Sequence, residues 1–521
     1  MMPQITPAAP AQAPQMTIVD MVREAARKAP EAEAVVCGDT RRTWALFDAR
    51  VNRLANALIA RGISRGDRVA ALAPNSAEYA ELFMATLRAG ACMVPLSTMA
   101  SAEALEKMIR DSGAKVLFLA QAYRDLVAPF EGALVLGARV AFDFDADRWE
   151  GYETFLAEGE ARDPMVPVGM EDAFNIIYSS GTTGTPKGIL HNHHLRAVQQ
   201  TTAFDNGYGD NARCLLSTPL YSNTTIVAFL PTLTQGGCVH LMAKFDARAY
   251  LEIVERERIT HTMLVPVQYK RIMDVPDFDR FDLGSMRLKN STSAPLRADV
   301  KADVLARFPG RLVEYYGLTE GGGTTVLDAT ATPDKLHTVG QPAPGCTLKF
   351  IDDEGHELPA GEVGEIVGRA TTMMSGYFGR DDLTAEYLWH DAEGLAYFRS
   401  GDMGRLDADG YLILSDRKKD MIISGGLNIY ADDLERALLA IDGVRDAAVI
   451  GVPSDAWGET PLGLVVLDDG IAEGDVLAAA NAQLGKSQRL SAVEARAELP
   501  RSAIGKILKR ELRAPYWDAC A

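Results

Sequence analysis

Short apolar runs alternate with amphipathic helical patterns through about the first 170 residues of the chain. Residues 69–73 and 115–120 have the pattern of buried strands, and residues 78–89 that of a helix ending at Gly90. A parallel strand needs a crossover connection before the next one, so this alternation favours parallel sheets covered by helices. Three later runs, at 174–178, 261–267 and 312–316, continue the strand pattern.

The composition and pattern of the sequence change near Val339. From there on, glycine, proline and short strand patterns (346–352 and 362–369) dominate. After residue 416 a helical face at Leu434, Ala437, Leu438 and Ile441 precedes strand patterns at 446–452 and 462–467. We predict an α/β fold with a large N-terminal domain of parallel-type sheets covered by helices. It carries a small β-rich lobe and is followed by a small, mobile α+β domain. The predicted boundaries are a flexible leader at 1–16, the N-terminal domain at 17–416 and the C-terminal domain at 417–521.

Composition excludes several classes of protein. The 521 residues carry a net charge of −18, which argues against a general nucleic-acid binder because phosphate neutralisation needs surplus lysine and arginine. The six cysteines show no paired spacing, so free thiols in a reducing compartment are expected rather than zinc or disulfides. No apolar run approaches the roughly 18 residues of a membrane span, and the leader lacks the order of a signal peptide. The sequence therefore predicts a cytoplasmic protein.

The most informative segment follows the strand pattern at 174–178 and is called the phosphate loop here (residues 179–187). Its hydroxyl residues, glycines and terminal lysine are Ser179, Ser180, Gly181, Thr182, Thr183, Gly184, Thr185 and Lys187. Glycines let backbone N–H groups approach phosphate oxygens closely, and the lysine supplies positive charge. The spacing does not fit the P-loop signature, because Lys187 follows Pro186 and precedes Gly188. Anion binding is thus expected without the fold of a P-loop NTPase.

The phosphate loop resembles that of the adenylate-forming superfamily, which includes acyl-CoA synthetases, adenylation domains and firefly luciferase. A second motif of that family is matched by Tyr315-Tyr316-Gly317-Leu318-Thr319-Glu320. The resemblance implies that Tyr316 stacks on adenine and that Thr319 contacts the α-phosphate. It further implies that Glu320 holds Mg²⁺, a hard cation that prefers oxygen ligands.

The remaining motifs of the family follow in the expected order. By resemblance, Asp402 in Ser400-Gly401-Asp402 binds the ribose together with Arg417, and Lys419 is the hinge of the C-terminal domain. Lys506, in a terminal motif at 500–507, resembles the lysine that bridges the substrate carboxylate and the α-phosphate. The wall of the CoA tunnel is assigned to Ser424, Gly425 and Gly426. The chain departs from the common Gly-Gly-Glu-Asn at Leu427.

Resemblance also places the acyl pocket on three loops and beside the second motif. The residues assigned to it are Tyr221, Ser222, Asn223, Val265, Gln268, Ser293, Ala294 and Gly317. Ser222 stands where a common version of the motif has histidine after the aromatic residue, so a histidine gate is not carried over. These segments carry no arginine to pair a second carboxylate. We expect a monocarboxylic acid of moderate size, aliphatic, alicyclic or aromatic.

The resemblance implies a ligase with ATP, Mg²⁺ and coenzyme A as cofactors or co-substrates. The acid would be activated as acyl-AMP with release of pyrophosphate, and its acyl group passed to the thiol of CoA. The catalytic residues would be Lys506, Thr319 and Glu320. Three alternatives stay open: loading of a carrier-protein thiol, luciferase-like oxidation of the adenylate, and a nucleotide-binding regulator without turnover. The partners expected are a small carboxylic acid and CoA, with a homodimer left open.

A cluster of histidines, His191, His193 and His194, follows the phosphate loop. Three histidines in a short segment invite a zinc interpretation. A structural or surface role is the favoured hypothesis, because zinc has no part in the chemistry that the other motifs imply.

Overall fold

The computed structural model describes residues 15–179, 186–201, 205–417, 420–424, 427–429, 431–454, 457–484, 489–502 and 505–518. The chain divides into two compact units. Unit 1 comprises residues 1–347 and 369–398, and unit 2 comprises residues 348–368 and 399–521. The domain boundary that the sequence analysis places between residues 416 and 417 stays a prediction. Among the described residues, no helix has the length and apolar character required to span a membrane.

The first sheet of unit 1 has eight strands in the order β19-β9-β8-β4-β3-β5-β6-β7. Strands β4, β3, β5 and β6 pair in parallel, whereas β8 and β9 form an antiparallel pair that β19 extends. Their bounds are β3 (Arg68–Leu72), β4 (Cys92–Pro95), β5 (Val116–Leu119), β6 (Ala138–Ala141), β7 (Glu150–Gly151), β8 (Ala173–Ser179), β9 (Lys187–Asn192) and β19 (Gly376–Tyr377). The parallel core confirms the expectation from the alternating sequence pattern.

The second sheet of unit 1 has nine strands in the order β16-β15-β14-β13-β12-β10-β11-β1-β2. Its members are β1 (Glu33–Cys37), β2 (Thr40–Thr43), β10 (Arg213–Leu216), β11 (Cys238–Leu241), β12 (His261–Leu264), β13 (Leu288–Ser291), β14 (Arg311–Tyr316), β15 (Thr325–Asp328) and β16 (Gln341–Pro342). The strand expected at 261–267 ends at Leu264. Pro266 is the first residue of the next helix, where its missing N–H costs nothing.

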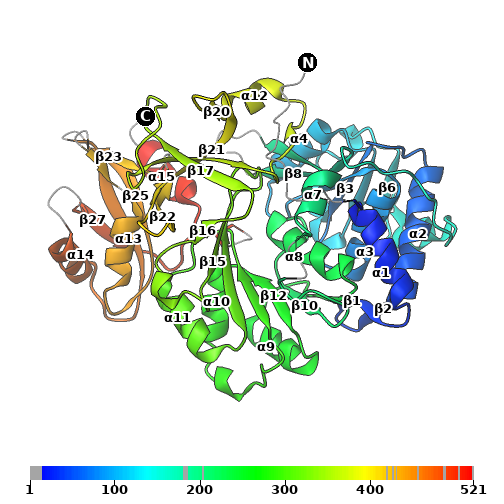
Figure 1. Cartoon of the computed structure of the whole chain (residues 1–521), viewed down its shortest axis with the longest axis horizontal. Helices are drawn as coiled ribbons and strands as arrows, with labels where there is room; N and C mark the ends of the chain where they lie inside the picture. Colours follow the sequence, from blue (N-terminus) through cyan, green and yellow to red (C-terminus); the bar gives the residue numbers. More distant parts are fainter. Residues whose placement is uncertain are drawn as a thin grey trace. The chain divides into compact units, whose positions relative to one another are not determined.

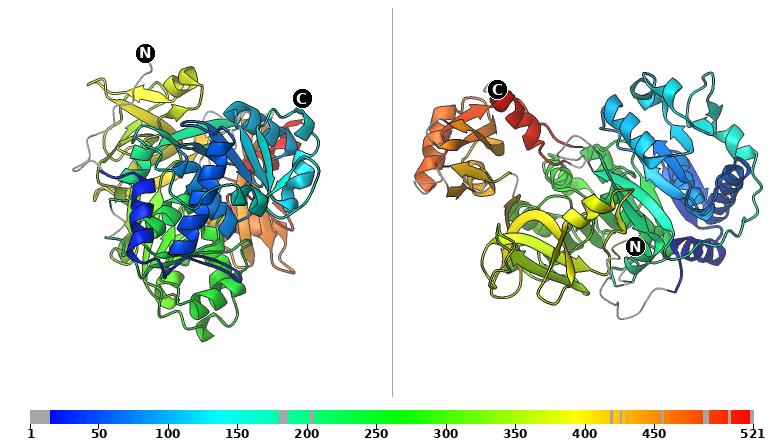
Figure 2. Two further views of the ribbon diagram at one scale, coloured as in Figure 1. Left: turned by 90° about the vertical axis from the view of Figure 1, so that its right-hand side faces the viewer. Right: turned by 90° about the horizontal axis from the view of Figure 1, so that it is seen from above.

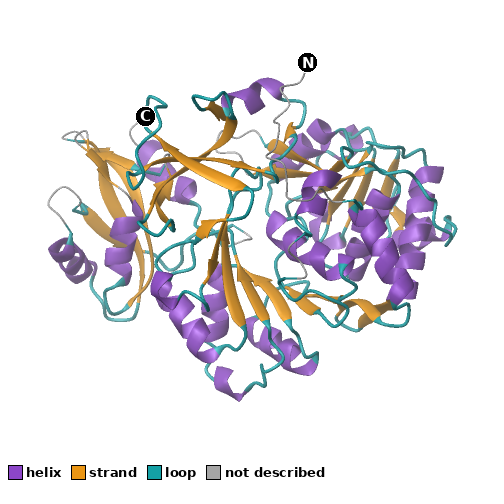
Figure 3. Cartoon of the chain, viewed as in Figure 1, coloured by secondary structure: helices purple, strands orange, loops and turns teal. Residues whose placement is uncertain are grey.

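Helices cover the sheets of unit 1, as Figure 3 shows in purple. The longer ones are α1 (Ile18–Lys28), α2 (Trp44–Ala60), α3 (Ala77–Arg88), α4 (Ala102–Ser112), α8 (Asn223–Thr234), α9 (Ala247–Arg256), α10 (Pro266–Met273) and α11 (Ala298–Arg307). The shorter ones are α5 (Arg124–Val127), α6 (Tyr152–Ala157), α7 (His193–Val198) and α12 (Asp381–Glu386). Helices α1 and α2 contact each other (Figures 1 and 2). The predicted helix 78–89 is α3.

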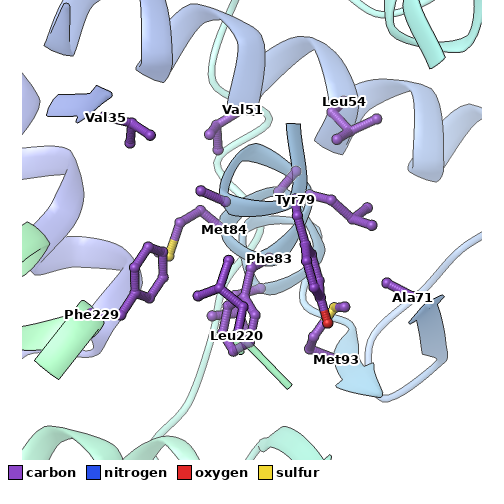
Figure 4. Packing of buried hydrophobic residues seen from close by; sticks show 14 of the residues in the cluster. Val35, Val51, Leu54, Ala71, Tyr79, Phe83, Met84, Met93, Leu220 and Phe229 are labelled. Carbon is purple, nitrogen blue, oxygen red and sulfur yellow. The ribbon is translucent and has the colours of Figure 1, made fainter. Parts of the chain in front are cut away.

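The core explains why nearly every residue of α3 is buried. It contacts β4 of the first sheet and β1 of the second, and Phe83 and Met84 lie in the cluster drawn in Figure 4. Successive residues of β3 belong to different clusters, Val69 to that of α3 and Ala70 to that of α4. Side chains alternate across a strand, so this split means that both faces of the first sheet are buried.

Unit 2 has two β-rich parts. The first contains β17 (Cys346–Ile351), β18 (Gly364–Ala370), β21 (Ala396–Leu406) and β22 (Leu412–Arg417), with β17, β18 and β21 each crossing the unit boundary. The short β20 (Leu388–His390) of unit 1 pairs with the start of β21. The second part has the order β24-β23-β26-β25 with β27 on β26. It comprises β23 (Ile422–Ser424), β24 (Leu427–Ile429), β25 (Val444–Ser454), β26 (Gly458–Leu467), β27 (Ala492–Ala495), α13 (Ala431–Leu439), α14 (Glu473–Gln483) and α15 (Lys509–Asp518).

Candidate functional site

The predicted phosphate loop joins β8 to β9. Residues 180–185 lie outside the described part of the chain, whereas Ser179 and Lys187 face each other as the last pair of the β8–β9 ladder. Gly188 lies against the β8 strand: a Cβ there would stand 2.9 Å from a side-chain carbon of Ile176. The two ends of the loop are therefore held together by an antiparallel ladder with a close side-chain contact.

Lys187 is oriented by two tyrosines that sequence reasoning missed. Its Nζ donates a hydrogen bond of 2.6 Å to the hydroxyl of Tyr387. The same Nζ lies 4.4 Å from the ring centre of Tyr387 and 5.6 Å from that of Tyr377. Tyr377 belongs to β19, which pairs with β9, and the two tyrosine rings meet edge to face. Aromatic faces attract ammonium groups, so the pair fixes where the charge lies.

The Thr319–Glu320 pair lies just after β14, which ends at Tyr316. The Tyr377 hydroxyl donates to Glu320 Oε1 at 3.0 Å, and the Met374 backbone N–H donates to the Glu320 carbonyl at 2.8 Å. Burial and the Glu320 carboxylate together raise the pKa of Tyr377, which keeps its hydroxyl a donor. Gly321 has φ +79°, and a Cβ there would overlap the Thr372 carbonyl. Glycine is thus required where the loop meets residues 372–374.

Lys187 and Glu320 are brought into one neighbourhood by Tyr377. One ring contacts the cation through its π face and the carboxylate through its hydroxyl. A carboxylate is a ligand that a hard cation such as Mg²⁺ prefers, and its hydrogen bond with Tyr377 fixes how the Glu320 carboxylate points. The donor chemistry at Glu320 therefore fits the metal that the sequence implied. The arrangement offers a positive and a negative group about one tyrosine, and the positive group is the last residue of the phosphate loop.

The residues assigned to the acyl pocket follow the carboxyl ends of parallel strands in the second sheet. Ser222 caps helix α8, and its hydroxyl accepts from the Thr224 N–H at 3.3 Å. The Thr224 hydroxyl lies 2.5 Å from that of Ser293, a residue with φ +79°. Two loops that are distant in sequence are thus joined. Crevices at the carboxyl ends of such strands are where ligands bind in open α/β sheets.

Other pocket residues are buried and polar. Gln268 accepts from the Val265 N–H at 3.3 Å through Oε1 and lies 3.5 Å from the Ser217 carbonyl through Nε2. Within the part of the chain that the structure describes, the hydroxyls of Ser217 and Ser291 are buried without a hydrogen-bond partner, whereas that of Tyr221 is buried beside Ser97 and Thr98. Burial raises the pKa of Tyr221, which keeps it neutral. Ala294 is half-buried on the Ser293 loop, and Gly317 lies against Thr324.

Unit 2 holds the residues expected at the ribose. Asp402 is 7% exposed and lies opposite Arg417 in the β21–β22 ladder. The Asp402 backbone N–H donates to the Ser400 hydroxyl at 3.0 Å, and that hydroxyl donates to the Ile366 carbonyl at 2.7 Å. The ladder thus places the two predicted ribose residues side by side along the backbone.

Lys506, the predicted catalytic lysine, forms backbone hydrogen bonds with Ser502. Ser502 donates its N–H to the Lys506 carbonyl at 2.8 Å, and its hydroxyl accepts from the Lys506 N–H at 3.2 Å. Gly505 has φ +76°, and its carbonyl accepts from Arg501 at 2.7 Å. These bonds fix the backbone at Lys506.

Of the remaining residues assigned in the C-terminal region, the structure describes only Ser424. Ser424 ends β23 and pairs with Gly458 of β26. The hinge residue Lys419 and the tunnel residues Gly425 and Gly426 lie outside the described residues. Their roles stay predictions.

Comparison with known proteins gives matches over most of the chain. The sequence pattern of AMP-binding enzymes matches residues 22–378, and that of the AMP-binding enzyme C-terminal domain matches residues 433–506. A feruloyl-CoA synthase from Amycolatopsis sp is 37% identical, with 94% of this chain and 97% of that protein covered. The long-chain-fatty-acid–CoA ligase FadD13 of Mycobacterium tuberculosis is 32% identical over 95% of this chain and 98% of that one. ATP-bound MatB from Rhodopseudomonas palustris superposes with a TM-score of 0.87 at 30% identity, covering 97% and 100% of the two chains.

Proposed function

Because the chain belongs to the family of AMP-binding enzymes, we propose that it is an ATP-dependent acyl-CoA synthetase for a monocarboxylic acid. The observation that carries the proposal is the placement of Lys187, the last residue of the phosphate loop, and Glu320 about Tyr377. A fixed cation and a carboxylate suited to Mg²⁺ are the groups that a bound triphosphate needs. The proposed setting is the cytoplasm.

In the first step a carboxylate oxygen of the acid attacks the α-phosphorus of ATP. The new O–P bond forms as the bond from the α-phosphorus to the bridging oxygen breaks, and pyrophosphate leaves with that electron pair. Lys187 and the phosphate loop hold the phosphates, while Thr319 and Lys506 stabilise charge at the α-phosphate. Mg²⁺ held by Glu320 neutralises phosphate charge when bound. Catalysis here is positioning and electrostatic stabilisation.

In the second step the thiol of CoA attacks the acyl carbon of the adenylate. The C–S bond forms, the bond from the acyl carbon to the phosphate oxygen breaks, and AMP leaves. The thiol proton is released to solvent, so the products are the thioester, AMP and a proton. We propose that Lys506 leaves the site before this step through rotation of the C-terminal domain about Lys419. The thiol must reach the acyl carbon, and Lys506 lies beside that carbon in the first step. Domain movements of this kind occur on μs–ms timescales.

We propose a moderately sized monocarboxylic acid, aliphatic, alicyclic or aromatic. The loops at 221–225, 265–268 and 291–295 contain no arginine or lysine to pair a second carboxylate. Arg196 lies behind Asn223, but its N–H groups bind neutral acceptors of the protein itself. The relatives include the feruloyl-CoA synthase, the long-chain-fatty-acid–CoA ligase and an indoleacetate–CoA ligase from Aromatoleum aromaticum. Aryl-substituted and fatty acids therefore head the panel to be tested.

The test is AMP formation with ATP and Mg²⁺ across a panel of carboxylic acids, each with and without CoA. Sustained AMP release that needs both an acid and CoA is the expected result, and the same experiment ranks the acids. Malonate and succinate serve as dicarboxylate controls and should be poor substrates. Absence of acid-dependent AMP or pyrophosphate release with every acid would contradict the proposal.

A second candidate acceptor is a carrier-protein thiol. It is favoured by a relative that is 30% identical over 98% of this chain, the fatty acid–[acyl-carrier-protein] ligase ScoC of Streptomyces coeruleorubidus. Acid-dependent pyrophosphate release that stalls with CoA but turns over with a phosphopantetheinylated carrier protein would favour this acceptor.

A further inference from the structure

Arg196 of helix α7 is completely buried, and all of its N–H groups are used. Its Nε and Nη2 donate to the Asn175 side-chain oxygen at 3.2 and 2.9 Å. Nη2 also donates to His191 Nδ1 at 2.9 Å, and Nη1 donates to Gln199 Oε1 and Asn223 Oδ1 at 3.1 and 2.9 Å. A guanidinium has five N–H donors, so its hydrogen-bonding capacity is filled. Each of these acceptors is a neutral group.

This arginine determines the proton positions of its neighbours. A guanidinium only donates, so the atom of Asn175 that it contacts is the oxygen, and the Asn175 nitrogen therefore faces His191 Nδ1 at 3.1 Å. His191 Nδ1 thus receives two donors and must be unprotonated. The proton of the neutral ring is on Nε2, which donates to the backbone carbonyl of Thr319 at 2.7 Å. Burial and the Arg196 charge lower the pKa of His191 and keep the ring neutral.

The chain of contacts joins three parts of unit 1. Asn175 and His191 lie on β8 and β9, which flank the phosphate loop, and Asn223 is the first residue of α8 at the predicted acyl pocket. Thr319 stands 128 residues from His191 in the sequence and directly precedes Glu320. The side chains of Asn175, His191 and Arg196 are each at most 1% exposed. The centre of the link is therefore shielded from solvent.

We propose that Arg196, Asn175 and His191 are positioning residues that fix the Thr319 carbonyl, and so orient the Thr319 hydroxyl and the Glu320 carboxylate toward ATP. Resting on the proposed function, this inference adds the residues that hold the reactive loop to the phosphate-loop strands. Through Asn223 the same arginine ties the start of the acyl pocket to that loop. Acid and nucleotide are thereby presented from one rigid framework.

Energetics favour this interpretation over a purely structural one. A buried cation that has only neutral acceptors loses its hydration without gaining a counter-charge, and apolar replacements of buried charged groups are often neutral or stabilising. Burial lowers the pKa of Arg196 to about 9, which reflects that cost. A directional network of this kind fixes geometry. Misplacement of reacting groups by about 1 Å can cost about 10²-fold in rate.

The test uses three variants of the full chain. His191→Phe keeps the ring volume and removes the bond to Thr319, whereas His191→Gln offers one acceptor and one donor of similar reach. His261→Phe is the matched control, because His261 is also a buried strand histidine bonded to a backbone carbonyl, that of Asn206 at 3.2 Å. Amide hydrogen exchange of residues 317–323 and single-turnover pyrophosphate release are measured on each. His191→Asn, too short to reach Thr319, replaces His191→Phe if that variant does not fold.

We expect faster exchange at 317–323 and about 10- to 100-fold slower pyrophosphate release in His191→Phe, with His191→Gln and His261→Phe close to the wild type. Equal losses in His191→Phe and His261→Phe would overturn the inference, as would a rate that is unchanged while exchange rises. A His191→Gln variant as slow as His191→Phe would do the same. Absence of acid-dependent pyrophosphate release in the wild type would refute the proposed function instead, while the exchange comparison would still decide whether His191 holds the loop.

Discussion

The ammonium group of Lys187 donates a hydrogen bond of 2.6 Å to the hydroxyl of Tyr387, although the two residues stand 200 positions apart in the sequence. The bond ties the last residue of the phosphate loop to the segment that follows α12. A long lysine side chain loses considerable rotamer freedom when it is fixed. Because Tyr387 holds it before ATP arrives, binding need not supply that ordering.

Tyr387→Phe should lower kcat/KM for ATP about fivefold, the equivalent of a hydrogen bond of about 1 kcal/mol. The ring, and hence its contact with the cation, is kept. Lys187→Met should cost about 10²–10³-fold, since it removes the charge itself. Steady-state kinetics at saturating acid and CoA measure both. A Tyr387→Phe loss as large as that of Lys187→Met would contradict the orienting role.

Tyr377→Phe should weaken the enzyme's use of Mg²⁺. The hydroxyl that orients Glu320 at 3.0 Å is lost while the ring over Lys187 remains. We expect the Mg²⁺ concentration for half-maximal pyrophosphate release to rise several-fold. Tyr250→Phe, a change of the same size in helix α9, is the control and should leave it unchanged. An unaltered Mg²⁺ dependence in Tyr377→Phe would show that Glu320 is oriented without this bond.

Lys506→Ala should lower the rate of adenylate formation at least about 10²–10³-fold. Thioester formation from pre-made acyl-AMP should keep its normal rate. The charge is needed where negative charge develops on the α-phosphate, and the second step does not use it. Separate assays of the two half-reactions measure the effect. Equal losses in both would show that the role assigned to Lys506 is wrong.

Lys419→Pro should produce the reverse pattern. Proline fixes φ near −65°, so the backbone rotation proposed at the hinge would be restricted. Acyl-AMP should form at close to the normal rate, and its transfer to CoA should slow at least tenfold. Lys418→Pro, one residue earlier, tests whether any proline in this segment has the same effect. Normal transfer in Lys419→Pro would place the hinge elsewhere.

His193 should make the protein less stable in acid. It is buried against the edge of the Phe174 ring, with a centroid distance of 4.9 Å, and burial lowers its pKa to about 4 from 6.5. The unfolded chain therefore takes up a proton that the folded chain resists, and stability present above pH 6.5 is lost as the pH falls toward 4. A shift of this size corresponds to about 3 kcal/mol at full effect.

The thermal unfolding midpoint, measured from pH 7 to pH 4.5, tests that prediction. His193→Asn should show a smaller fall over this range than the wild type, because it has no group that titrates there. His240 and His261 are also buried with lowered pKa values, so part of the fall should remain in the variant. An identical fall in both proteins would exclude His193 as a contributor.

Sequence patterns predicted helices and strands well where the pattern of apolar residues was strongly periodic. Helix 78–89 and strands 69–73 and 174–178 agree with α3, β3 and β8 to within about a residue. The strand expected at 261–267 is three residues too long, because apolar residues continue past the end of β12 into helix α10. An apolar run does not show whether the next turn is helix or strand. The proline at 266 was the available signal.

The sequence by itself determined which chemical groups the protein carries and in what order: a phosphate loop with Lys187, the pair Thr319–Glu320, and the C-terminal Lys506. Tertiary structure decided which side chains orient them. No local sequence pattern marks the roles of Tyr377, Tyr387 and Arg196. The sequence around a tyrosine or arginine does not show whether its side chain orients a reactive group or packs in a core. Tyr377 is placed by the pairing of β9 with the distant strand β19, and Tyr387 by its position directly after helix α12. Arg196 is placed by its hydrogen bonds to Asn175 and His191 of the β8–β9 pair. Contacts of this kind are properties of the folded chain.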